Sequence, residues 1–580
     1  MISITIDGKS TEVLEGTTVL RAAEQAGVTI PTLCDHPALP PYGGCRLCVV
    51  EVQGFRTPIA SCTLPASQGM VVNTDTEKLR SIRKFVLTML FSERNHFCPF
   101  CQKTGGDCEL QNAAYGEDMT HWPISPNWTP FPVDASHPFF IFDHNRCILC
   151  RRCVRACASM TGNFTLDLEN RGTNTMIVAD YGLPMAESTC IRCGSCVQVC
   201  PTGALIDRYS AYQGLEKDAA ELETLCLGCS VGCGLHLLVR DNRIIRVLGG
   251  WDAPVNKGVL CELGRYETLN EKRSRVEVPM VRKNGGLAPV SWDEALQTVA
   301  NKLQTISGDP GKRVAALAST RLTAEQLYAF QQLFNHVLNS SMVTSLEGSF
   351  TNAVLADSNL YGTFDDLKAS DFVLIIGADV VNSHQVAGFF VKRNRPAGVR
   401  IILVDPAENA TSEVANFVLN NQPGSDEALV RGLLYGVINL GFSKDGGSPI
   451  GAEAIAQAAQ ISGIGTDTLL TVCRELGQAE KPVIIIGKGV TRSSGSTLVA
   501  LEDLAHVTGA VLVNVNGKAN TLAAQSYQLD KVFDPGSHEV VYVALGDDYL
   551  TPRLTENLNK SSYLVLQTSY ENALDRKSVV

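Results

Sequence analysis

The chain of 580 residues lacks the features that mark membrane-spanning, secreted and nucleic-acid-binding proteins. It contains no run of about eighteen apolar residues, the length that a transmembrane helix needs. Its first residues, MISITIDGKS, alternate apolar and polar and lack the basic and apolar regions of a secretory signal peptide. A net charge of −11 has the wrong sign for nucleic acid or an anionic membrane surface as the main partner. We therefore expect a cytoplasmic protein that does not itself span a membrane, whether free or at the cytoplasmic face of a membrane complex.

Cysteine is nearly absent from the second half of the chain and abundant in the first. Of the twenty cysteines, nineteen precede residue 262 and only Cys473 follows it. A disulfide scaffold is typical of short secreted chains, whereas this length and a hydrophobic content of 45% predict several domains with sizeable cores. Tight CxxC spacing in a long chain without a leader favours bound metal instead.

The first cysteine group is Cys34-x10-Cys45-x2-Cys48-x13-Cys62, preceded by strand-like residues 2–6 and a helical segment at 18–26. Gly43 and Gly44 leave bare backbone before Cys45, where N–H groups can approach cluster sulfurs. Four thiolates in one loop-rich segment suit a [2Fe–2S] cluster, with zinc as the alternative. PYGGCRLCVVEV and the ten-residue first gap resemble the amino-terminal ferredoxin domain of the G subunit of complex I. The resemblance implies a β-grasp [2Fe–2S] ferredoxin over residues 1–78.

The second group is His96-x-Cys98-x2-Cys101-x6-Cys108, after an amphipathic segment at 78–91. A lone His is usually structural, but these three cysteines lack a nearby fourth, and His96 completes the set. NHFCPFC…GDCELQ resembles the one-His, three-Cys [4Fe–4S] segment of complex I, related hydrogenases and some formate dehydrogenases, here at residues 79–121. The single residue between His96 and Cys98 is more similar to the diaphorase iron–sulfur subunit of NAD-linked hydrogenases.

Two longer cysteine runs follow an extended, Pro- and aromatic-rich linker at 122–138. They match the bacterial two-cluster ferredoxin, in which the fourth Cys of each run ligates the other cluster. Residues 138–212 are thus predicted to hold two [4Fe–4S] clusters. The pattern assigns Cys147, Cys150, Cys153 and Cys200 to one cluster, and Cys190, Cys193, Cys196 and Cys157 to its partner.

The fifth group is Cys226-x2-Cys229-x3-Cys233-x27-Cys261. Alone it suits zinc, but it resembles the [4Fe–4S] motif that opens the molybdopterin oxidoreductase family, here a subdomain at 221–277. Family-like words follow: APVSWDEAL, DFVLIIGAD, RIILVDP and PVIIIGKGV. Apolar runs alternating with helical stretches predict a mostly parallel α/β sheet over 290–580, within a molybdopterin-oxidoreductase-like domain at 278–580.

Three short sequence features of this last domain predict local structure. Ser291 and Glu294 have capping-box spacing at a helix start. Gly487-x-Gly489 lacks the third glycine of a dinucleotide fingerprint, since Arg492 stands there, so a tight strand–helix turn is the better account. Cys473, in TDTLLTVCREL, has apolar neighbours and is interpreted as a small core residue.

The sequence offers little support for a catalytic last domain. Nineteen cysteines and His96 fill five four-ligand sets, which leaves too few thiols for an [FeFe] hydrogenase centre. Formate dehydrogenases carry a metal-binding Cys or selenocysteine where this chain has GSFTNAVL, at 348–355, with Ser349 the nearest substitute. Leu263 stands where the family has a lysine that bridges cluster and pterin. The chain also ends at ENALDRKSVV, where catalytic relatives continue. We interpret the domain as truncated and without molybdopterin.

The pattern predicts an electron carrier with one [2Fe–2S] and four [4Fe–4S] clusters. The resemblance implies the iron–sulfur subunit of a multisubunit NAD(H)-linked oxidoreductase, not catalytic alone. Its implied partners are a flavin-containing NADH-binding subunit, a small [2Fe–2S] subunit, and hydrogenase or quinone-reductase subunits. The alternative is the catalytic subunit of a molybdenum- or tungsten-dependent, NAD-linked formate dehydrogenase.

Overall fold

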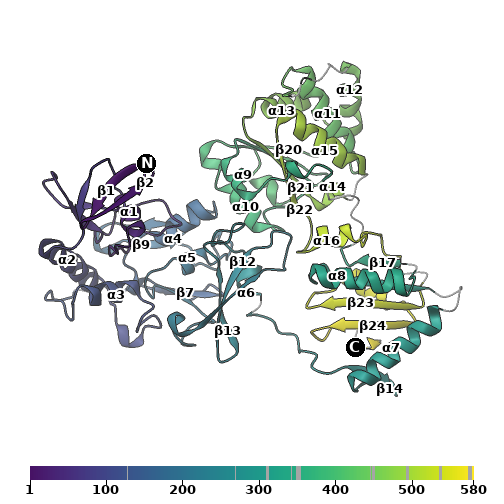
Figure 1. Cartoon of the computed structure of the whole chain (residues 1–580), viewed down its shortest axis with the longest axis horizontal. Coiled ribbons are helices and arrows are strands. Elements are labelled where there is room, and N and C mark those ends of the chain that lie inside the picture. The colour runs from purple at the N-terminus through teal and green to yellow at the C-terminus, as the bar shows by residue number, and fades with distance from the viewer. Residues whose placement is uncertain are drawn as a thin grey trace. The chain divides into compact units, whose positions relative to one another are not determined.

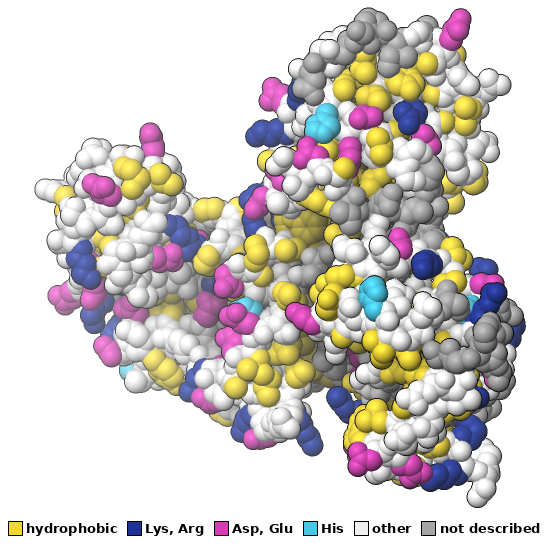
Figure 2. All heavy atoms as spheres, turned by 45° about the vertical axis from the view of Figure 1, so that its right-hand side comes forward, with side chains coloured by type: hydrophobic (Ala, Val, Ile, Leu, Met, Phe, Trp, Pro, Cys, Tyr) yellow, Lys and Arg dark blue, Asp and Glu magenta, His cyan; other side chains and the backbone are white. Residues whose placement is uncertain are grey.

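The computed structural model describes residues 1–126, 128–267, 269–307, 313–340, 342–347, 355–444, 446, 451–491, 495–534, 538–572 and 578–579. They form two compact units: Met1–Thr224 with Cys233–Leu269, and Leu225–Gly232 with Asn270–Val580 (Figure 1). Among these residues, no helix has both the length and the apolar character needed to cross a membrane. Acidic and basic side chains are interspersed on the face shown in Figure 2.

The first unit opens with a mixed five-stranded sheet in the order β2-β1-β5-β3-β4. β1 runs antiparallel to β2 and parallel to β5. Helix α1 (Val19–Gln25) packs Val19 and Leu20 into the core of this sheet, and Thr18 caps it by accepting from the Arg21 N–H. The helix expected at 18–26 is therefore present. The strands are β1 (Ile2–Ile6), β2 (Lys9–Val13), β3 (Val49–Val52), β4 (Ile59–Ala60) and β5 (Val71–Asn73).

The rest of the first unit consists of one long helix, α2 (Glu77–Glu93), and of short elements between cysteine-bearing turns. Helix α2 begins at a Thr76 cap and includes the amphipathic segment expected at 78–91. A π-helical turn, Ala156–Met160, carries Cys157, and such turns are frequent at functional sites. The other elements are α3 (Glu109–Gly116), β6 (Val133–Asp134), β7 (Phe140–Asp143), α4 (Arg152–Arg155), β8 (Leu166–Glu169), β9 (Met176–Ala179), α5 (Ser195–Gln198), β10 (Leu205–Asp207), β11 (Ala220–Leu225), β12 (Gly234–Arg240), β13 (Arg243–Gly249) and α6 (Glu262–Tyr266).

The second unit contains two parallel five-stranded sheets, where the sequence predicted one. The first has the order β17-β16-β23-β24-β25 and the second the order β20-β19-β18-β21-β22. The parallel character is confirmed and the single sheet is wrong. The chain leaves the first sheet after β17, completes the second, and returns with β23; periodicity identifies strands but not their neighbours. The strands are β16 (Val314–Ala318), β17 (Met342–Ser345), β18 (Phe372–Ile376), β19 (Arg400–Val404), β20 (Phe417–Leu419), β21 (Pro482–Gly487), β22 (Val511–Val515), β23 (Val540–Gly546), β24 (Tyr563–Thr568) and β25 (Ser578–Val579).

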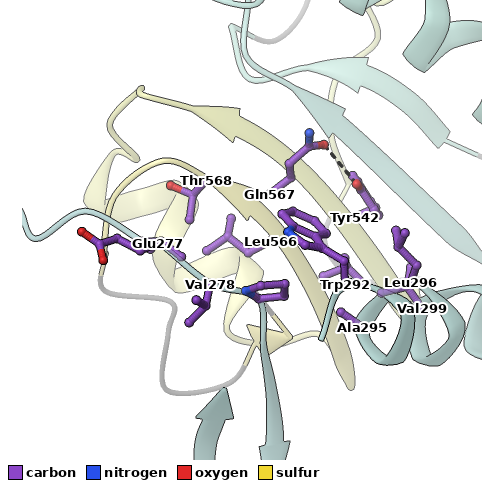
Figure 3. A pocket seen from close by; sticks show the side chains of 13 residues that line it. Glu277, Val278, Trp292, Ala295, Leu296, Val299, Tyr542, Leu566, Gln567 and Thr568 are labelled. Atoms are coloured by element: carbon purple, nitrogen blue, oxygen red, sulfur yellow. Dashed lines mark hydrogen bonds between the residues drawn. The ribbon is translucent and has the colours of Figure 1, made fainter. Parts of the chain in front are cut away.

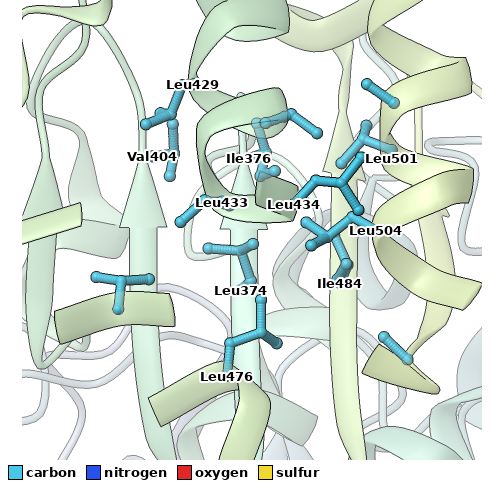
Figure 4. Packing of buried hydrophobic residues seen from close by; sticks show 14 of the residues in the cluster. Leu374, Ile376, Val404, Leu429, Leu433, Leu434, Leu476, Ile484, Leu501 and Leu504 are labelled. Carbon is cyan, nitrogen blue, oxygen red and sulfur yellow. The ribbon is translucent and has the colours of Figure 1, made fainter. Parts of the chain in front are cut away.

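The second sheet carries the largest apolar core of the described residues. Leucines of α11 (Asp426–Asn439), α13 (Thr466–Gln478) and α15 (Gly495–Thr508) pack over Leu374, Ile376 and Ile484 of the strands (Figure 4). Cys473 is fully buried in this cluster, which confirms its interpretation as a core residue. The remaining elements are β14 (Met280–Lys283), β15 (Gly286–Pro289), α7 (Trp292–Ser307), α8 (Ala324–Gln331), α9 (Phe364–Ala369), α10 (Gln385–Lys392), α12 (Ala452–Ser462), α14 (Lys488–Thr491), α16 (Thr521–Ser526) and α17 (Pro552–Leu558).

Two of the short sequence features of this domain are confirmed, the helix start at Ser291 and the strand–helix turn at Gly487, while only the serine half of the expected capping box is recorded. Helix α7 starts after Ser291, whose Oγ accepts from the Glu294 N–H at 3.2 Å, while the Glu294 carboxylate pairs with Lys283. β21 passes directly into α14, so Gly487-x-Gly489 is a strand–helix turn. A Cβ on Gly487 would lie 2.2 Å from the Gly377 carbonyl oxygen, which explains the glycine. Arg492 lies outside the described residues.

Candidate metal centres

The first predicted ligand set lies in the loops that connect the strands of the opening sheet. Cys34, Cys48 and Cys62 are buried and Cys45 is half-buried. The Cys34 thiol is within hydrogen-bonding reach of Cys45 and Cys62, and Cys62 of Cys48. This mutual interaction lowers the pKa of Cys34 and raises the pKa of Cys45 and Cys62. The Cys45 N–H donates to Cys34 Sγ at 3.4 Å. The loop thus brings all four thiols together.

The second set surrounds one small cavity, which His96, Cys98, Cys101 and Cys108 all line. The Nε2 atom of His96 is buried and has no hydrogen-bond partner among the described residues. Burial, reinforced by Arg146 and Arg94, lowers the pKa of His96 to about 4. The imidazole is therefore neutral at pH 7, which is the state that binds metal.

A glycine completes the wall of this cavity. A Cβ added at Gly203 would lie 2.5 Å from Cys101 Sγ, so the backbone approaches the sulfur as closely as only glycine allows. Cys108 immediately precedes α3, and the N–H groups of Leu110 and Gln111 point at its sulfur. The donor set, the buried nitrogen without a partner and the glycine wall fit a cluster with one histidine and three cysteine ligands.

The two long runs form two sets that exchange their fourth cysteines. Cys200 lines one cavity together with Cys147, Cys150 and Cys153. In the other set, the thiol of Cys157 interacts electrostatically with the thiols of Cys190, Cys193 and Cys196. Both runs share one hydrophobic cluster, which also contains Phe140 and Leu205. The assignment of these eight cysteines to two clusters stays a prediction from their spacing.

The two runs repeat the same turn at their first cysteines. The N–H of Leu149 donates to Cys147 Sγ at 3.4 Å, and the N–H of Arg192 to Cys190 Sγ at 3.4 Å. Leu149 and Arg192 both have positive φ, 52° and 55°. Backbone N–H bonds to sulfur are one of the means by which proteins tune iron–sulfur clusters.

The fifth set is divided between the two units. Cys226 and Cys229 belong to the second unit, and Cys233 and Cys261 to the first. Locally the same N–H to sulfur pattern recurs: Gly228 donates to Cys226 at 3.5 Å and Gly264 to Cys261 at 3.3 Å. The assignment of these four ligands stays a prediction from their spacing.

The chemistry of the thiols suits bound iron. The fifteen cysteines of the first four sets form no disulfide bond. Among the described residues, no group of three or more Cys, His, Asp or Glu side chains is arranged to hold a single metal ion. Burial raises the pKa of both Cys108 and Cys147 to about 11. Such thiols ionise only when a cation compensates the charge, which an iron–sulfur cluster does.

Arginines that the sequence analysis did not single out tie the cysteine loops together. Arg155 donates to the carbonyls of Cys34 and Pro40, joining the first set to α4. Arg152 makes two bonds to the Glu109 carboxylate, at 2.6 and 2.7 Å. The only sequence signal for them is their position inside the cysteine run RRCVRAC.

Four charged side chains meet at the carboxyl ends of both sheets of the second unit. Glu347 follows β17 and Asp548 follows β23, while Lys488 and Lys518 follow β21 and β22. Lys488 Nζ lies 2.6 Å from Glu347 Oε2, and Lys518 Nζ lies 2.6 Å from Asp548 Oδ1 and 3.4 Å from Glu347 Oε1. Each ion pair therefore joins one sheet to the other. Ligands of open parallel sheets bind at this edge.

Two further positions bear on a pterin cofactor. Leu263, which replaces the family lysine, is 60% exposed. Ser349 and the rest of 348–354 lie outside the described residues. A separate cavity of about 270 Å³ beside α7 is lined by Trp292, Leu296 and sheet residues, including the hydrogen-bonded Tyr542–Gln567 pair (Figure 3). Its lining contains neither cysteine nor histidine, the two ligand types of the predicted clusters.

Five family descriptions match the chain in order. They are the 2Fe-2S iron-sulfur cluster binding domain at 1–77, the NADH-ubiquinone oxidoreductase-G iron-sulfur binding region at 83–122, the 4Fe-4S dicluster domain at 146–204, the molybdopterin oxidoreductase Fe4S4 domain at 220–268, and molybdopterin oxidoreductase at 275–542. Together with the cysteine sets, these matches define an iron–sulfur oxidoreductase chain.

Several named proteins are similar to this chain over most or part of its length. The chain is 32% identical to the NADH-quinone oxidoreductase G subunit 2 of Rhizobium meliloti, over 85% of this chain and 58% of the relative. It is 30% identical to the alpha subunit of the NADPH-Fe(3+) oxidoreductase of Geobacter sulfurreducens, over 89% of this chain and 63% of the relative. A solved NAD+-reducing [NiFe]-hydrogenase chain is 38% identical, with a TM-score of 0.34, over 37% of this chain and 91% of that chain.

Residues 220–268 and 275–542 match the molybdopterin oxidoreductase superfamily, and the chain as a whole is similar to NADH-quinone oxidoreductase G subunits. It spans about 60% of the length of the curated relatives it matches.

Proposed function

We propose that this chain is the iron–sulfur electron-transfer subunit of a multisubunit NAD(H)-linked oxidoreductase. It relays electrons between a flavin/NADH module and a second catalytic module, a hydrogenase or a quinone-reducing arm. The observation that carries the proposal is the distribution of thiols. Nineteen cysteines fall into sets with cluster spacing, and the twentieth, Cys473, is buried in an apolar core. No thiol is left over for a further redox centre.

The proposed cofactors are one [2Fe–2S] and four [4Fe–4S] clusters, which supply one-electron carriage when bound. The first lies in a β-grasp ferredoxin domain at 1–78, and the others at 79–121, 138–212 and 221–277. The proposed ligands are Cys34, Cys45, Cys48 and Cys62 for [2Fe–2S], and, for the four [4Fe–4S] clusters, His96, Cys98, Cys101 and Cys108; Cys147, Cys150, Cys153 and Cys200; Cys190, Cys193, Cys196 and Cys157; and Cys226, Cys229, Cys233 and Cys261.

The surrounding residues adapt these sites to electron transfer. Phe91 and Leu110 line the His96 cavity and exclude water from the sulfurs. Backbone N–H groups stabilise negative charge on the sulfur ligands. A neutral imidazole at position 96 leaves that site one negative charge short of four thiolates, so we expect it to have a higher reduction potential than an all-cysteine equivalent.

We propose further that the second unit holds no molybdopterin. Both lysines at the carboxyl edge of its sheets, Lys488 and Lys518, are neutralised by Glu347 and Asp548. An anionic pterin nucleotide at this edge would have to displace those carboxylates. The residues therefore do not fit an anionic cofactor, and the domain acts as a scaffold for its neighbours.

The alternative is a molybdenum- or tungsten-dependent formate dehydrogenase. One observation favours it: the hydroxyls of Thr320 and Ser345, beside the ends of β16 and β17, are buried and have no hydrogen-bond partner in the described part of the chain. A bound cofactor can satisfy such groups. The putative formate dehydrogenase of Bacillus subtilis is 26% identical to this chain.

We propose the partners that the resemblance to complex I and NAD-linked hydrogenases implies. They are a flavin-containing NADH-binding subunit, a small [2Fe–2S] subunit, and hydrogenase or quinone-reductase subunits. We place the complex in the cytoplasm or at its membrane face, because reduced cluster thiols need a reducing compartment.

The test is metal and subunit analysis of the complex purified anaerobically. About eighteen irons per chain, with matching acid-labile sulfide, are expected for this set of clusters. Stoichiometric zinc, or about ten irons, contradicts the scheme. Stoichiometric molybdenum or tungsten with extractable pterin favours the alternative. Co-purifying flavin and hydrogenase or quinone-reductase subunits identify the second module.

A further inference from the structure

Arg265 makes three hydrogen bonds between segments far apart in the sequence. Its Nε donates to the Cys193 carbonyl at 2.6 Å, its NH1 group to the Val247 carbonyl at 3.1 Å, and its NH2 group to Gln198 Oε1 at 2.8 Å. The residue is only 3% exposed. It lies on α6, four residues after Cys261, so its guanidinium links α6 to the turn that carries Cys193.

The Cys193 turn is shaped to receive this side chain. Gly194 has φ of 69°, and a Cβ there would lie 2.4 Å from Arg265 Cδ and 2.6 Å from Tyr266 Oη. Tyr266 stacks on Phe139 with ring centroids 4.1 Å apart, which fixes the same end of α6. The planar guanidinium can serve three acceptors in fixed directions, which a lysine ammonium cannot.

The charge of Arg265 has no anionic partner among these contacts. All three acceptors are neutral: two backbone carbonyls and an amide oxygen. A buried positive charge acts in a medium of low dielectric constant, so it favours negative charge nearby far more than a solvated one does. Cys193, whose carbonyl it binds, is a proposed ligand of the cluster on Cys190, Cys193, Cys196 and Cys157.

We propose that Arg265 is a positioning residue that holds the Cys193 turn against α6 and raises the reduction potential of the cluster bound there. Adding an electron makes the cluster more negative, and the fixed positive charge stabilises that reduced state. The proposal rests on the proposed function, because it presupposes a cluster on this set. It adds a specific tuning residue outside the ligand sets.

The test is an EPR-monitored redox titration of the full chain, purified anaerobically, with R265M and R265K. In R265M, one [4Fe–4S] cluster should become harder to reduce. At the midpoint potential of that cluster in the wild type, its ratio of reduced to oxidised form should fall roughly tenfold, which corresponds to a midpoint lower by about 59 mV for one electron. R265K keeps the charge and should restore most of that ratio. Arg243→Met, an exposed arginine on β13, is the matched control and should change no signal.

Two results would overturn the proposal. One is an iron-replete R265M whose midpoints all equal those of the wild type; the other is an equal shift in the Arg243→Met control. If R265M loses about four irons, R265Q replaces it, since a neutral amide can still donate to one carbonyl. A wild-type potential in iron-replete R265Q then contradicts the charge effect. Failure of the proposed function is a separate result: the wild-type chain itself would lack the iron.

Discussion

At the scale of the residue, His96 is the position where the ligand type matters most. We expect His96→Ala to lose about four irons per chain, because a buried cavity with three thiols lacks its fourth donor. His96→Cys should keep the iron and shift one midpoint to a more negative potential, since a thiolate adds a negative charge to the site. Iron analysis and redox titration measure both effects.

The control for these variants is His121→Ala, which removes an exposed histidine whose Nδ1 lies 3.3 Å from the hydroxyl of Thr120. It should leave iron and potentials unchanged. Full iron content in His96→Ala, with unaltered midpoints, would show that another group is the ligand.

A second pair of variants separates ligand cysteines from packing cysteines. Cys157→Ser should weaken or remove a cluster, and the affected signal should be the one that Cys190→Ser also alters, because the two thiols share a set. Cys473→Ala should leave iron unchanged and lower the free energy of unfolding by about 1 kcal/mol, the usual cost of a small buried deletion. If Cys157→Ser instead alters the signal that Cys147→Ser alters, Cys157 belongs to the cluster of its own run, and the exchange of fourth cysteines is wrong.

The residue scale also shows what spacing can and cannot reveal. The intervals within each cysteine run are local, and their match to the two-cluster ferredoxin pattern predicts the grouping of Cys147 with Cys200 without a structure. The bond from Arg265 to the Cys193 carbonyl spans 72 residues and depends on where α6 packs. The residues next to Arg265, Gly264 and Tyr266, do not indicate that this arginine is buried rather than exposed to solvent.

At the scale of the element, the two sheets of the second unit depend on the ion pairs at their carboxyl ends. Asp548 is 1% exposed and accepts from Lys518 and from Ser319 Oγ. We expect Asp548→Asn to destabilise this unit by about 1–3 kcal/mol, because a buried charge-assisted network loses its anion. The urea midpoint of the second unit, followed by hydrogen exchange at β16 and β23, measures the change.

The matched control is Glu556→Gln, which breaks an exposed helical pair with Lys560 at 3.9 Å. Such surface pairs contribute little, so its unfolding free energy should stay within about 0.5 kcal/mol of the wild type. Equal midpoints for all three proteins would mean that the ion pairs do not stabilise the two sheets.

The expected fold was wrong in one respect, the number of sheets in the second unit, and the reason lies in how the strands pair. Helix α1, helix α7 and the turn at Gly487 were predictable because capping residues and periodicity act within a few positions. The number of sheets was not, because β16 pairs with β23, more than two hundred residues later. Strand order is decided by tertiary packing, which a one-dimensional pattern does not contain.

At the scale of the whole molecule, the two units should depend differently on iron. The cores of the first unit include proposed ligands, such as Cys48, Cys62, Cys153 and Cys196. The largest core of the second unit contains only Cys473. Because metal binding contributes directly to folding where ligands form the core, stripping the clusters with oxidant and chelator should loosen the first unit and spare the second.

Hydrogen exchange on the full chain tests this difference, with cluster-free and cluster-bound samples compared segment by segment. Amides of β7 and α4 should lose protection, while those of β18 and β21 keep theirs. Oxidant-treated protein without chelator, checked for full iron content, controls for damage unrelated to metal. Simultaneous loss of protection in both units would contradict the expectation. It would mean that the parallel sheets rely on the clusters for their own stability, and that a cluster-independent scaffold is the wrong description of the second unit.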